Sequence, residues 1–255
     1  MILAIDVGNT NIVIGSIDNG EIRNVVRIHT DTRETEAEYT IKLKEIFYAY
    51  GMAIEAFDGA ILSSVVPQVT GALCRAVKLL TGLDCMVVGP GMKTGMNVRV
   101  DDPGTVAGDL ITGGVAAMQY YGTPVIVLDL GTATTCTVVD RGGNFRGGAI
   151  LPGIKLSYRA LASGTSLLPD ISITAPKKSI ATNTVDCMRS GAVFGTAAIL
   201  DGMFDRMEAE LGYPCTLVAT GGLAPAVTPF CRREVICDSD LLLKGLWALW
   251  EKNRK

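Results

Sequence analysis

The sequence contains a single histidine, His29, and no Cys-x-x-Cys pair. A lone histidine in a polar stretch after a predicted strand is expected to be a solvated loop residue, so Ser-His or Cys-His catalysis is a poor explanation of function. The seven cysteines are odd in number, and most lie in apolar patterns. This favours buried reduced thiols over a disulfide framework or a zinc site.

The sequence also lacks any apolar run of about 18 residues, the length a membrane-spanning helix needs. Its N-terminal apolar run is five residues long and leads directly into Asp6, so no signal peptide is predicted. The net charge is −3 and the basic residues are scattered, which argues against a nucleic-acid-binding protein. We therefore expect a cytoplasmic protein with neither a membrane nor a nucleic acid as partner.

The most informative stretch that is present is Asp6-Val7-Gly8-Asn9-Thr10-Asn11, which lies between two short apolar runs that are typical of buried strands. Gly8 can adopt a positive φ and lets a ligand approach the backbone. Backbone N–H groups and the Thr10 hydroxyl can donate to phosphate oxygens, and Asp6 can hold a hydrated metal ion. Taken alone, the stretch is explained equally well by an Asx-type turn without a ligand.

A second stretch of the same design changes this balance. The apolar run 125–128 leads into Asp129-Leu130-Gly131-Thr132-Ala133-Thr134, and another apolar run follows. Two strand–turn–strand units of one pattern indicate the two phosphate loops of a duplicated nucleotide-binding fold. With 48% hydrophobic residues and 29 glycines among 255 residues, the chain can form one large domain or two moderate ones.

Periodicity and turn residues predict the remaining elements. Strands are expected over 1–5, 12–17, 21–28, 59–66, 85–88, 125–130, 134–139, 145–150 and 215–219. Helices are expected over 35–50, 67–80, 105–121, 154–162 and 184–211, and in a terminal segment that starts near Ser239. Thr184 is expected to be the N-cap of the long helix. The stretch 89–104 has no clear periodicity and is interpreted as a functional loop and hinge.

A third glycine turn, Thr220-Gly221-Gly222, follows a predicted buried strand, so an adenine or ribose can lie flat against its backbone. The alternative is a strand-to-helix turn that needs only a positive φ. The phosphate loops contain no lysine and the Walker signature is absent, so a metal ion and backbone donors must neutralise most of the phosphate charge. A carboxylate outside the loops is then needed as base. The candidates are Asp101, Asp102 and Asp109, of which Asp109 is favoured because it stands among apolar and small residues.

The paired loops resemble those of the actin-like ATPase and sugar-kinase superfamily, and the whole chain resembles the type III pantothenate kinases of bacteria. The landmarks span nearly the full length: 63–67, 91–95, 103–109, 147–153, 183–184 with 190–191, and 220–224. The resemblance implies an α/β protein with a duplicated actin-like ATPase (ribonuclease H-like) fold. Two mixed-sheet halves, residues 1–115 and 116–255, would enclose an ATP cleft, with the first loop in one half and the second loop and adenosine turn in the other.

The resemblance also implies ATP-dependent phosphorylation of pantothenate to 4′-phosphopantothenate, the first step of coenzyme A biosynthesis, by a homodimeric enzyme. Asp109 would be the general base and would line the pantothenate site with Ala107, Gly108, Leu110 and Thr184. Asp129 would bind a monovalent cation, K⁺ or NH₄⁺, and Asp6 would hold Mg²⁺ through water. The residues that would contact ATP are Asp6, Val7, Gly8, Asn9, Thr10, Asn11, Ile12, Val13, Thr132, Gly221 and Gly222.

The acceptor side departs from the family pattern in two places. The family usually has Gly-Ala-Asp-Arg where this chain has Ala107-Gly108-Asp109-Leu110, and often tyrosine where this chain has Val100. Arg99 or Lys93 can replace the missing arginine. The departures leave two alternatives open: a kinase of another small hydroxyl compound, or a non-catalytic ATP-binding regulator. The retained Asp109 argues against the regulator, because a regulator needs no base.

Overall fold

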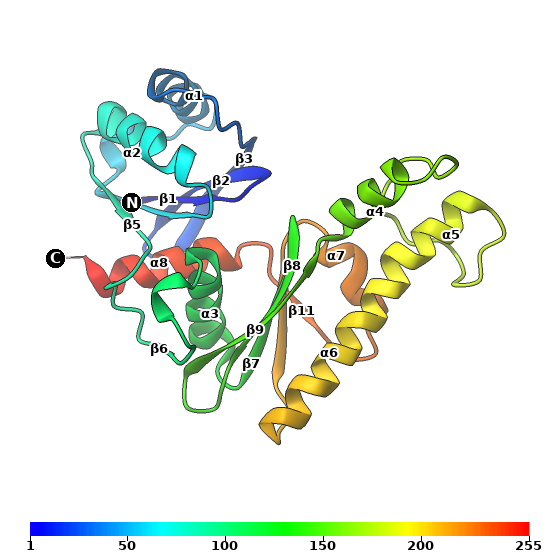
Figure 1. Cartoon of the computed structure of the whole chain (residues 1–255). Coiled ribbons are helices and arrows are strands. Elements are labelled where there is room, and N and C mark those ends of the chain that lie inside the picture. Colours follow the sequence, from blue (N-terminus) through cyan, green and yellow to red (C-terminus); the bar gives the residue numbers. More distant parts are fainter. Residues whose placement is uncertain (255) are drawn as a thin grey trace. The chain divides into compact units, whose positions relative to one another are not determined.

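The computed structural model describes residues 1–254, and the chain divides into two compact units (Figure 1). Unit 1 comprises Met1–Met96, Asp101–Gln119 and the chain from Leu241 onward, and unit 2 comprises Asn97–Val100 and Tyr120–Asp240. This division differs from the boundary expected between residues 115 and 116. The terminal helix belongs to unit 1 because it packs on strands of that unit, and residues 97–100 belong to unit 2 because they add a strand to its sheet.

Unit 1 is built on a five-stranded sheet in the order β3-β2-β1-β4-β5. Its strands are β1 (Ile2–Val7), β2 (Asn11–Asp18), β3 (Glu21–His29), β4 (Gly59–Ser64) and β5 (Cys85–Val87). Its helices are α1 (Glu36–Ala49), α2 (Pro67–Thr81), α3 (Gly108–Tyr121) and α8 (Leu241–Asn253), with short 3₁₀ turns η1 (Ile54–Ala56) and η2 (Pro103–Thr105). Strands β1, β2 and β3 form an antiparallel meander, whereas β4 and β5 run parallel to β1.

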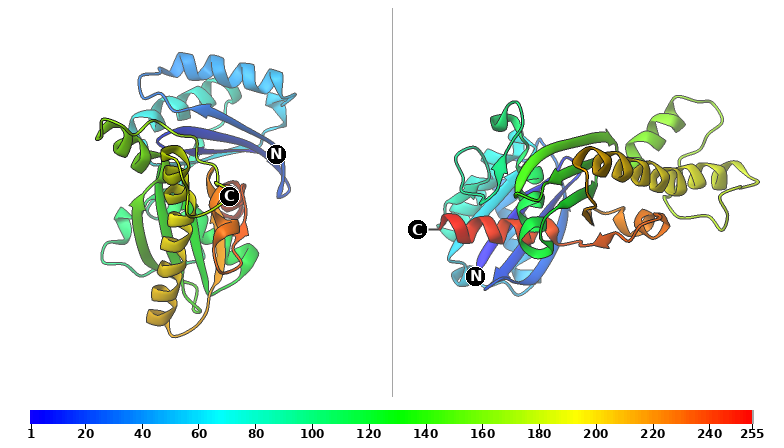
Figure 2. Two further views of the ribbon diagram at one scale, coloured as in Figure 1. Left: turned by 90° about the vertical axis from the view of Figure 1, so that its right-hand side faces the viewer. Right: turned by 90° about the horizontal axis from the view of Figure 1, so that it is seen from below.

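Helices cover both faces of the unit 1 sheet. On one face, Leu3, Ile5 and Val7 of β1 pack into a core with Tyr39 and Phe47 of α1. Side chains alternate along a strand, so Ile2, Ala4 and Asp6 point to the opposite face. That face carries α8, which contacts β1 and β4 (Figure 2). Glycine makes the close packing possible, because a Cβ at Gly59 would lie 2.0 Å from the ring of Trp250.

Unit 2 repeats this plan on a six-stranded sheet in the order β11-β10-β7-β8-β9-β6. Its strands are β6 (Asn97–Val98), β7 (Val125–Leu130), β8 (Ala133–Val139), β9 (Asn144–Pro152), β10 (Thr216–Thr220) and β11 (Ile236–Cys237). Strands β7, β8 and β9 form the antiparallel meander, and β10 and β11 run parallel to β7. Strand by strand, β7, β8, β9, β10 and β11 therefore correspond to β1, β2, β3, β4 and β5. The predicted duplication is confirmed.

The helices of unit 2 enclose a separate core on one face of its sheet. They are α4 (Ile154–Ser163), α5 (Thr184–Ser190), α6 (Thr196–Leu211) and α7 (Ala224–Val227), with the 3₁₀ turn η4 (Thr228–Phe230). A π-helical turn, η3 (Gly191–Gly195), joins α5 to α6, so the predicted long helix exists but contains a widened turn. A Cβ at Gly191 would lie 2.5 Å from the Tyr158 hydroxyl of α4, which explains why a small residue stands there.

Three sequence-based expectations need correction. The N-cap of α5 is Asn183, whose side chain accepts the Asp186 N–H at 2.9 Å, and Thr184 is the first helical residue. The stretch 89–104 is not loop throughout, since it contains β6 and η2. Gly8 does not have a positive φ; its position is restricted instead by the Asn11 carbonyl, which would lie 3.2 Å from a Cβ. No helix in the described part of the chain is long and apolar enough to cross a membrane.

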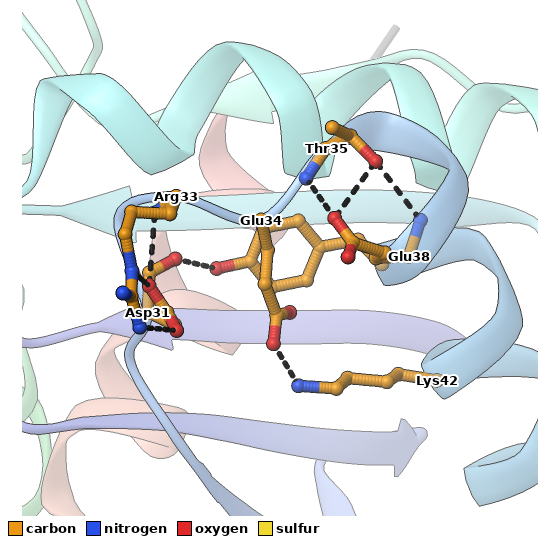
Figure 3. Close-up of polar contacts among 7 residues, drawn as sticks. Asp31, Arg33, Glu34, Thr35, Glu38 and Lys42 are labelled. Atoms are coloured by element: carbon orange, nitrogen blue, oxygen red, sulfur yellow. Dashed lines mark hydrogen bonds and ion pairs between the residues drawn. The ribbon is translucent and has the colours of Figure 1, made fainter.

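A polar cluster fixes the start of α1 (Figure 3). Thr35 and Glu38 form a capping box, in which the Thr35 hydroxyl accepts the Glu38 N–H and Glu38 accepts the Thr35 N–H. Asp31 accepts from Arg33 through backbone and side chain, and these hydrogen bonds lower the pKa of Asp31 to about 2. The Tyr39 hydroxyl donates to the Asp31 carbonyl at 3.0 Å. The segment between β3 and α1 is therefore held at several points.

Candidate active site

The first group of site residues in unit 1 lies at the carboxyl end of β1 and β4. Asp6 and Ser63 are paired in the parallel β1–β4 register, each one residue before its strand ends. Side-chain alternation places both on the face that carries α8, away from the core of α1 and α2. Asp6 is 8% exposed and Ser63 is fully buried. A carboxylate and a hydroxyl thus lie on adjacent strands, which are about 4.8 Å apart in a sheet.

The loop after Asp6 is clamped by the segment that follows β3. The Thr30 hydroxyl donates to the Gly8 carbonyl at 2.7 Å, and the Thr30 N–H donates to the Thr10 carbonyl at 3.0 Å. Gly8 N–H donates to the Asn11 carbonyl at 3.0 Å and closes the turn. Asn9 and Thr10 remain exposed at its tip. The loop is therefore a fixed, solvent-facing turn, as phosphate recognition by backbone donors requires.

Asp109 stands in the first turn of α3, in the same unit. It is half-buried, and its Oδ1 accepts the Leu110 N–H at 2.8 Å. Burial raises the pKa of Asp109, while the backbone donor opposes that shift. The residue before it, Gly108, brings α3 close to β4, since a Cβ there would lie 3.4 Å from the Ser63 hydroxyl oxygen. The first turn of α3 therefore adjoins the strand end that carries Ser63.

The other acidic candidates have plainer surroundings. The Asp102 side chain accepts the Gly104 N–H at 3.1 Å and caps η2, so it has a local structural role. Asp101 is exposed. Of the two basic candidates, Lys93 lies in unit 1 with Asp109, whereas Arg99 lies in unit 2, where its N–H donates to Phe145 of β9. Asp109 is thus the one of the three candidate carboxylates that is partly buried.

In unit 2, Asp129 occupies the position that corresponds to Asp6. It is the next-to-last residue of β7 and is paired with Thr135 of β8 and Thr220 of β10. Alternation places it opposite the core that Leu128 and Leu130 enter. A carboxylate between two threonines in register provides oxygen ligands, which suit a hard cation such as K⁺.

Two glycines shape the turns around Asp129. Gly221 follows β10 with a φ of +91°, and a Cβ there would lie 2.5 Å from Asp129 Oδ1 and 2.7 Å from the Leu130 backbone. Gly153, at the N-cap of α4, would collide in the same way with the Thr132 carbonyl at 2.1 Å. The backbone of the second loop thus packs directly against the backbone at Gly221 and at Gly153, with no side chain between them. Thr132 itself is exposed.

A pocket of about 320 Å³ adjoins the third glycine turn within unit 2. Leu223, Tyr158, Ile171 and Ile173 give it apolar walls. Its polar lining consists of Lys155, Arg159, Asp170 and Ser172. Cations beside an apolar, partly aromatic cavity suit an anionic ligand with a flat ring.

The structure therefore gathers the predicted residues into two groups, one in each unit. Unit 1 brings together Asp6, the first loop and the segment Ala107–Leu110. Unit 2 brings together Asp129, Thr132 and the turn Gly221–Gly222, while Thr184 stands exposed at the start of α5.

The sequence-based prediction did not include Ser63 or the pocket residues of α4. The period-2 alternation on β4 is a signal that places Ser63 on the face of Asp6. No local pattern marks Tyr158.

The residues that would hold Mg²⁺ fit that ion. The described residues contain no group of three or more His, Cys, Asp or Glu side chains able to hold a metal by themselves. Mg²⁺ in phosphoryl-transfer enzymes is bound through one or two carboxylates together with water and substrate phosphates. A single buried carboxylate, Asp6, next to an exposed turn is such a donor set.

Several solved structures share the fold of this chain. A Campylobacter jejuni protein described as belonging to the Baf family of transcriptional activators aligns with a TM-score of 0.59 at 18% identity, covering 98% of each chain. Component A of (R)-2-hydroxyglutaryl-CoA dehydratase from Acidaminococcus fermentans gives 0.57 at 14% identity, covering 97% of this chain and 95% of the other. The ROK hexokinase of Thermus thermophilus gives 0.51 at 11% identity, covering 97% of each chain.

The duplicated sheets and these neighbours define a protein of the actin-like ATPase and sugar-kinase fold. Within that class, residues 2–206 match the family described as type III pantothenate kinase. The chain belongs to this family and is thereby a pantothenate kinase, a phosphotransferase with an alcohol group as acceptor.

Proposed function

We propose that the chain transfers the terminal phosphoryl group of ATP to the primary hydroxyl of pantothenate, giving 4′-phosphopantothenate, with Asp109 as general base. Asp109 takes the hydroxyl proton while the hydroxyl oxygen bonds to the terminal phosphorus and the bond to the ADP oxygen breaks. The observation that carries the proposal is the half-buried Asp109 carboxylate, raised in pKa, in the α3 turn that adjoins the Asp6 strand end. This reaction is the first step of coenzyme A biosynthesis.

Asp6 and the first loop are assigned to the phosphates. We propose contacts to ATP from Asp6, Val7, Gly8, Asn9, Thr10, Asn11, Ile12 and Val13. Asp6 would hold Mg²⁺ through water, and the bound ion would neutralise charge that develops on the phosphates. The fixed turn Gly8–Asn11 supports this role, because Thr30 holds its backbone in place without any ligand.

Unit 2 is assigned the cation and the nucleoside. Asp129 would bind K⁺ or NH₄⁺, supported by its register neighbours Thr135 and Thr220. Thr132, Gly221 and Gly222 would contact ATP, and the pocket beside Leu223 is large enough to receive the adenosine. Replacing K⁺ by Na⁺ at constant ionic strength is expected to lower turnover. Equal rates in both salts would contradict the role of Asp129.

The pantothenate site is assigned to Ala107, Gly108, Asp109, Leu110 and Thr184. Leu110 stands where the family usually has arginine, so the polar positioning of pantothenate must come from other residues. The deciding assay follows ADP formation by purified protein with ATP, Mg²⁺ and K⁺, with and without pantothenate. Turnover that depends on pantothenate supports the proposal, turnover only with another small alcohol would reassign the acceptor, and binding of ATP without any turnover would indicate a regulator.

We also propose that the protein is a cytoplasmic homodimer. Unit 2 carries large exposed apolar side chains along α4, the connection after it and α6, at Leu156, Leu161, Leu167, Ile180 and Ile199. Leu167 is 89% exposed and Ile180 85%, and exposed apolar side chains of this size are candidates for an interface between two copies of the chain. Light scattering coupled to size exclusion should give twice the chain mass. An L161D/L167D double variant should shift it to the mass of one chain, and a monomeric wild type would refute the proposal.

A further inference from the structure

The Ser63 hydroxyl has no hydrogen-bond partner among the described residues, although the side chain is fully buried. Other serines in the same sheet are satisfied: Ser16, equally buried, accepts from Asn24 at 3.0 Å. Ser64 accepts from the Val66 N–H at 3.0 Å and from the Thr70 hydroxyl at 2.8 Å. A buried hydroxyl without a partner lowers stability, so its presence calls for a role outside the folding of the free protein.

The surroundings of Ser63 indicate what that role is. On one side lies Asp6, its register partner on the adjacent strand, on the same face of the sheet. On the other side lies the first turn of α3, where the Ser63 oxygen is 3.4 Å from the Cβ position of Gly108, the residue before Asp109. The hydroxyl thus adjoins the strand residue whose carboxylate is assigned to the phosphates and the helix turn that carries the carboxylate assigned to the acceptor. The group transferred from the phosphate site to the acceptor site in the reaction is the terminal phosphoryl group.

We propose that Ser63 Oγ–H donates a hydrogen bond to an oxygen of the terminal phosphate of bound ATP. This inference rests on the proposed function, which places phosphates at Asp6 and the acceptor at Asp109. The phosphate loops contain no lysine, so the metal ion and neutral hydrogen-bond donors must together stabilise the phosphate charge. Ser63 supplies one donor from a rigid strand. In the complex with ATP, the phosphate oxygen is the partner that the hydroxyl lacks in the free protein.

The test compares Ser63→Ala with the matched control Ser16→Ala, a buried serine of the same sheet that has a protein partner. For each protein we would measure guanidinium unfolding without ligand, and calorimetric binding of Mg·ADP and of the Mg complex of a non-hydrolysable ATP analogue. Ser63→Ala should be as stable as the wild type or more stable, because it removes an unpaired hydroxyl. It should bind the triphosphate analogue about tenfold to a hundredfold more weakly, the loss expected of a hydrogen bond to a charged group, and bind ADP normally.

The control should behave in the opposite way, with lower stability and unchanged nucleotide binding. Three results would overturn the inference. Destabilised Ser63→Ala with normal binding would make the serine structural. Unchanged stability and binding would mean that a buried water satisfies the hydroxyl. Equal losses for ADP and the triphosphate analogue would place the contact elsewhere on the nucleotide. The binding measurements need no acceptor alcohol. Their outcome is therefore independent of whether the kinase assay shows turnover with pantothenate.

Discussion

Replacing Gly221 by alanine tests how the third glycine turn holds Asp129. Gly221 has a φ of +91°, a left-handed conformation that costs an alanine about 1–2 kcal/mol. The added Cβ would also lie 2.5 Å from Asp129 Oδ1 and 2.7 Å from the Leu130 backbone, so the turn must shift. Overpacking of this kind costs about 1–3 kcal/mol, and the two effects together give about 2–5 kcal/mol.

The neighbouring glycine provides the control. A Cβ at Gly222 would meet no heavy atom within 4 Å, and its φ lies outside the left-handed region. Gly222→Ala should therefore change the free energy of unfolding by no more than about 0.5 kcal/mol. Both tryptophans, Trp247 and Trp250, lie in unit 1, so far-ultraviolet circular dichroism in guanidinium is the better readout for a change in unit 2.

The two variants also separate packing from cation binding. Because Gly221→Ala displaces the Asp129 carboxylate, it should weaken the stimulation by K⁺ more than Gly222→Ala does. The measurement is the K⁺ concentration that gives half-maximal turnover for each variant. Equal stability of the two variants would refute the reasoning about backbone contact. A destabilised Gly221→Ala with an unchanged K⁺ response would refute the link between this turn and the cation.

Three further predictions concern single carboxylates and one helix. Asp109→Asn should lower turnover by about a hundredfold or more while retaining ATP binding. Because burial raises the pKa of Asp109, wild-type activity should fall with decreasing pH above the range of an ordinary aspartate. The same raised pKa means that the stability contributed by the neutral carboxyl group is lost as pH rises through the folded pKa of Asp109. In urea unfolding at pH 7, Asp109→Asn should therefore be as stable as the wild type or more stable. Below the unfolded pKa of the aspartate, the two proteins should no longer differ in this way. Burial alone would raise the pKa of Asp140, but donors from Asn144, Arg146 and Gly142 outweigh it and lower the pKa. Its stabilising effect is present above the unfolded pKa and is lost as pH falls through the folded pKa, and Asp140→Ala should cost about 1–3 kcal/mol in chemical unfolding at pH 7. Gly108→Ala should raise the melting temperature, equivalent to about 0.4–1 kcal/mol, because its Cβ would make ordinary contacts at 3.4–3.5 Å; a lower melting temperature would mean that α3 cannot accept a methyl group beside Ser63.

Local sequence signals predicted most of the secondary structure. Pro67 opens α2 and Gly82 closes it with a φ of +76°, as their residue types indicate. The expected strands of the first hairpin appear as β1 and β2. Sequence patterns did not predict two short strands, because each of them depends on pairing with a distant partner. Strand β6 pairs with β9, and β11 pairs with β10. Asn183 rather than Thr184 became the N-cap because both residue types can cap a helix, and only the backbone decides between them.

By itself the sequence determined the two loops, the duplicated plan and Asp109 as the favoured base, since each depends on residue types within a few positions. Only the tertiary structure decided which side chains share a face and which polar groups lack a partner. Asp6 and Ser63 are 57 residues apart in the chain, and strand pairing makes them neighbours. The burial that raises the pKa of Asp109 comes from packing around α3, and the close approach at Gly221 comes from β7 beside β10. Such contacts depend on long-range packing, which short sequence patterns do not encode.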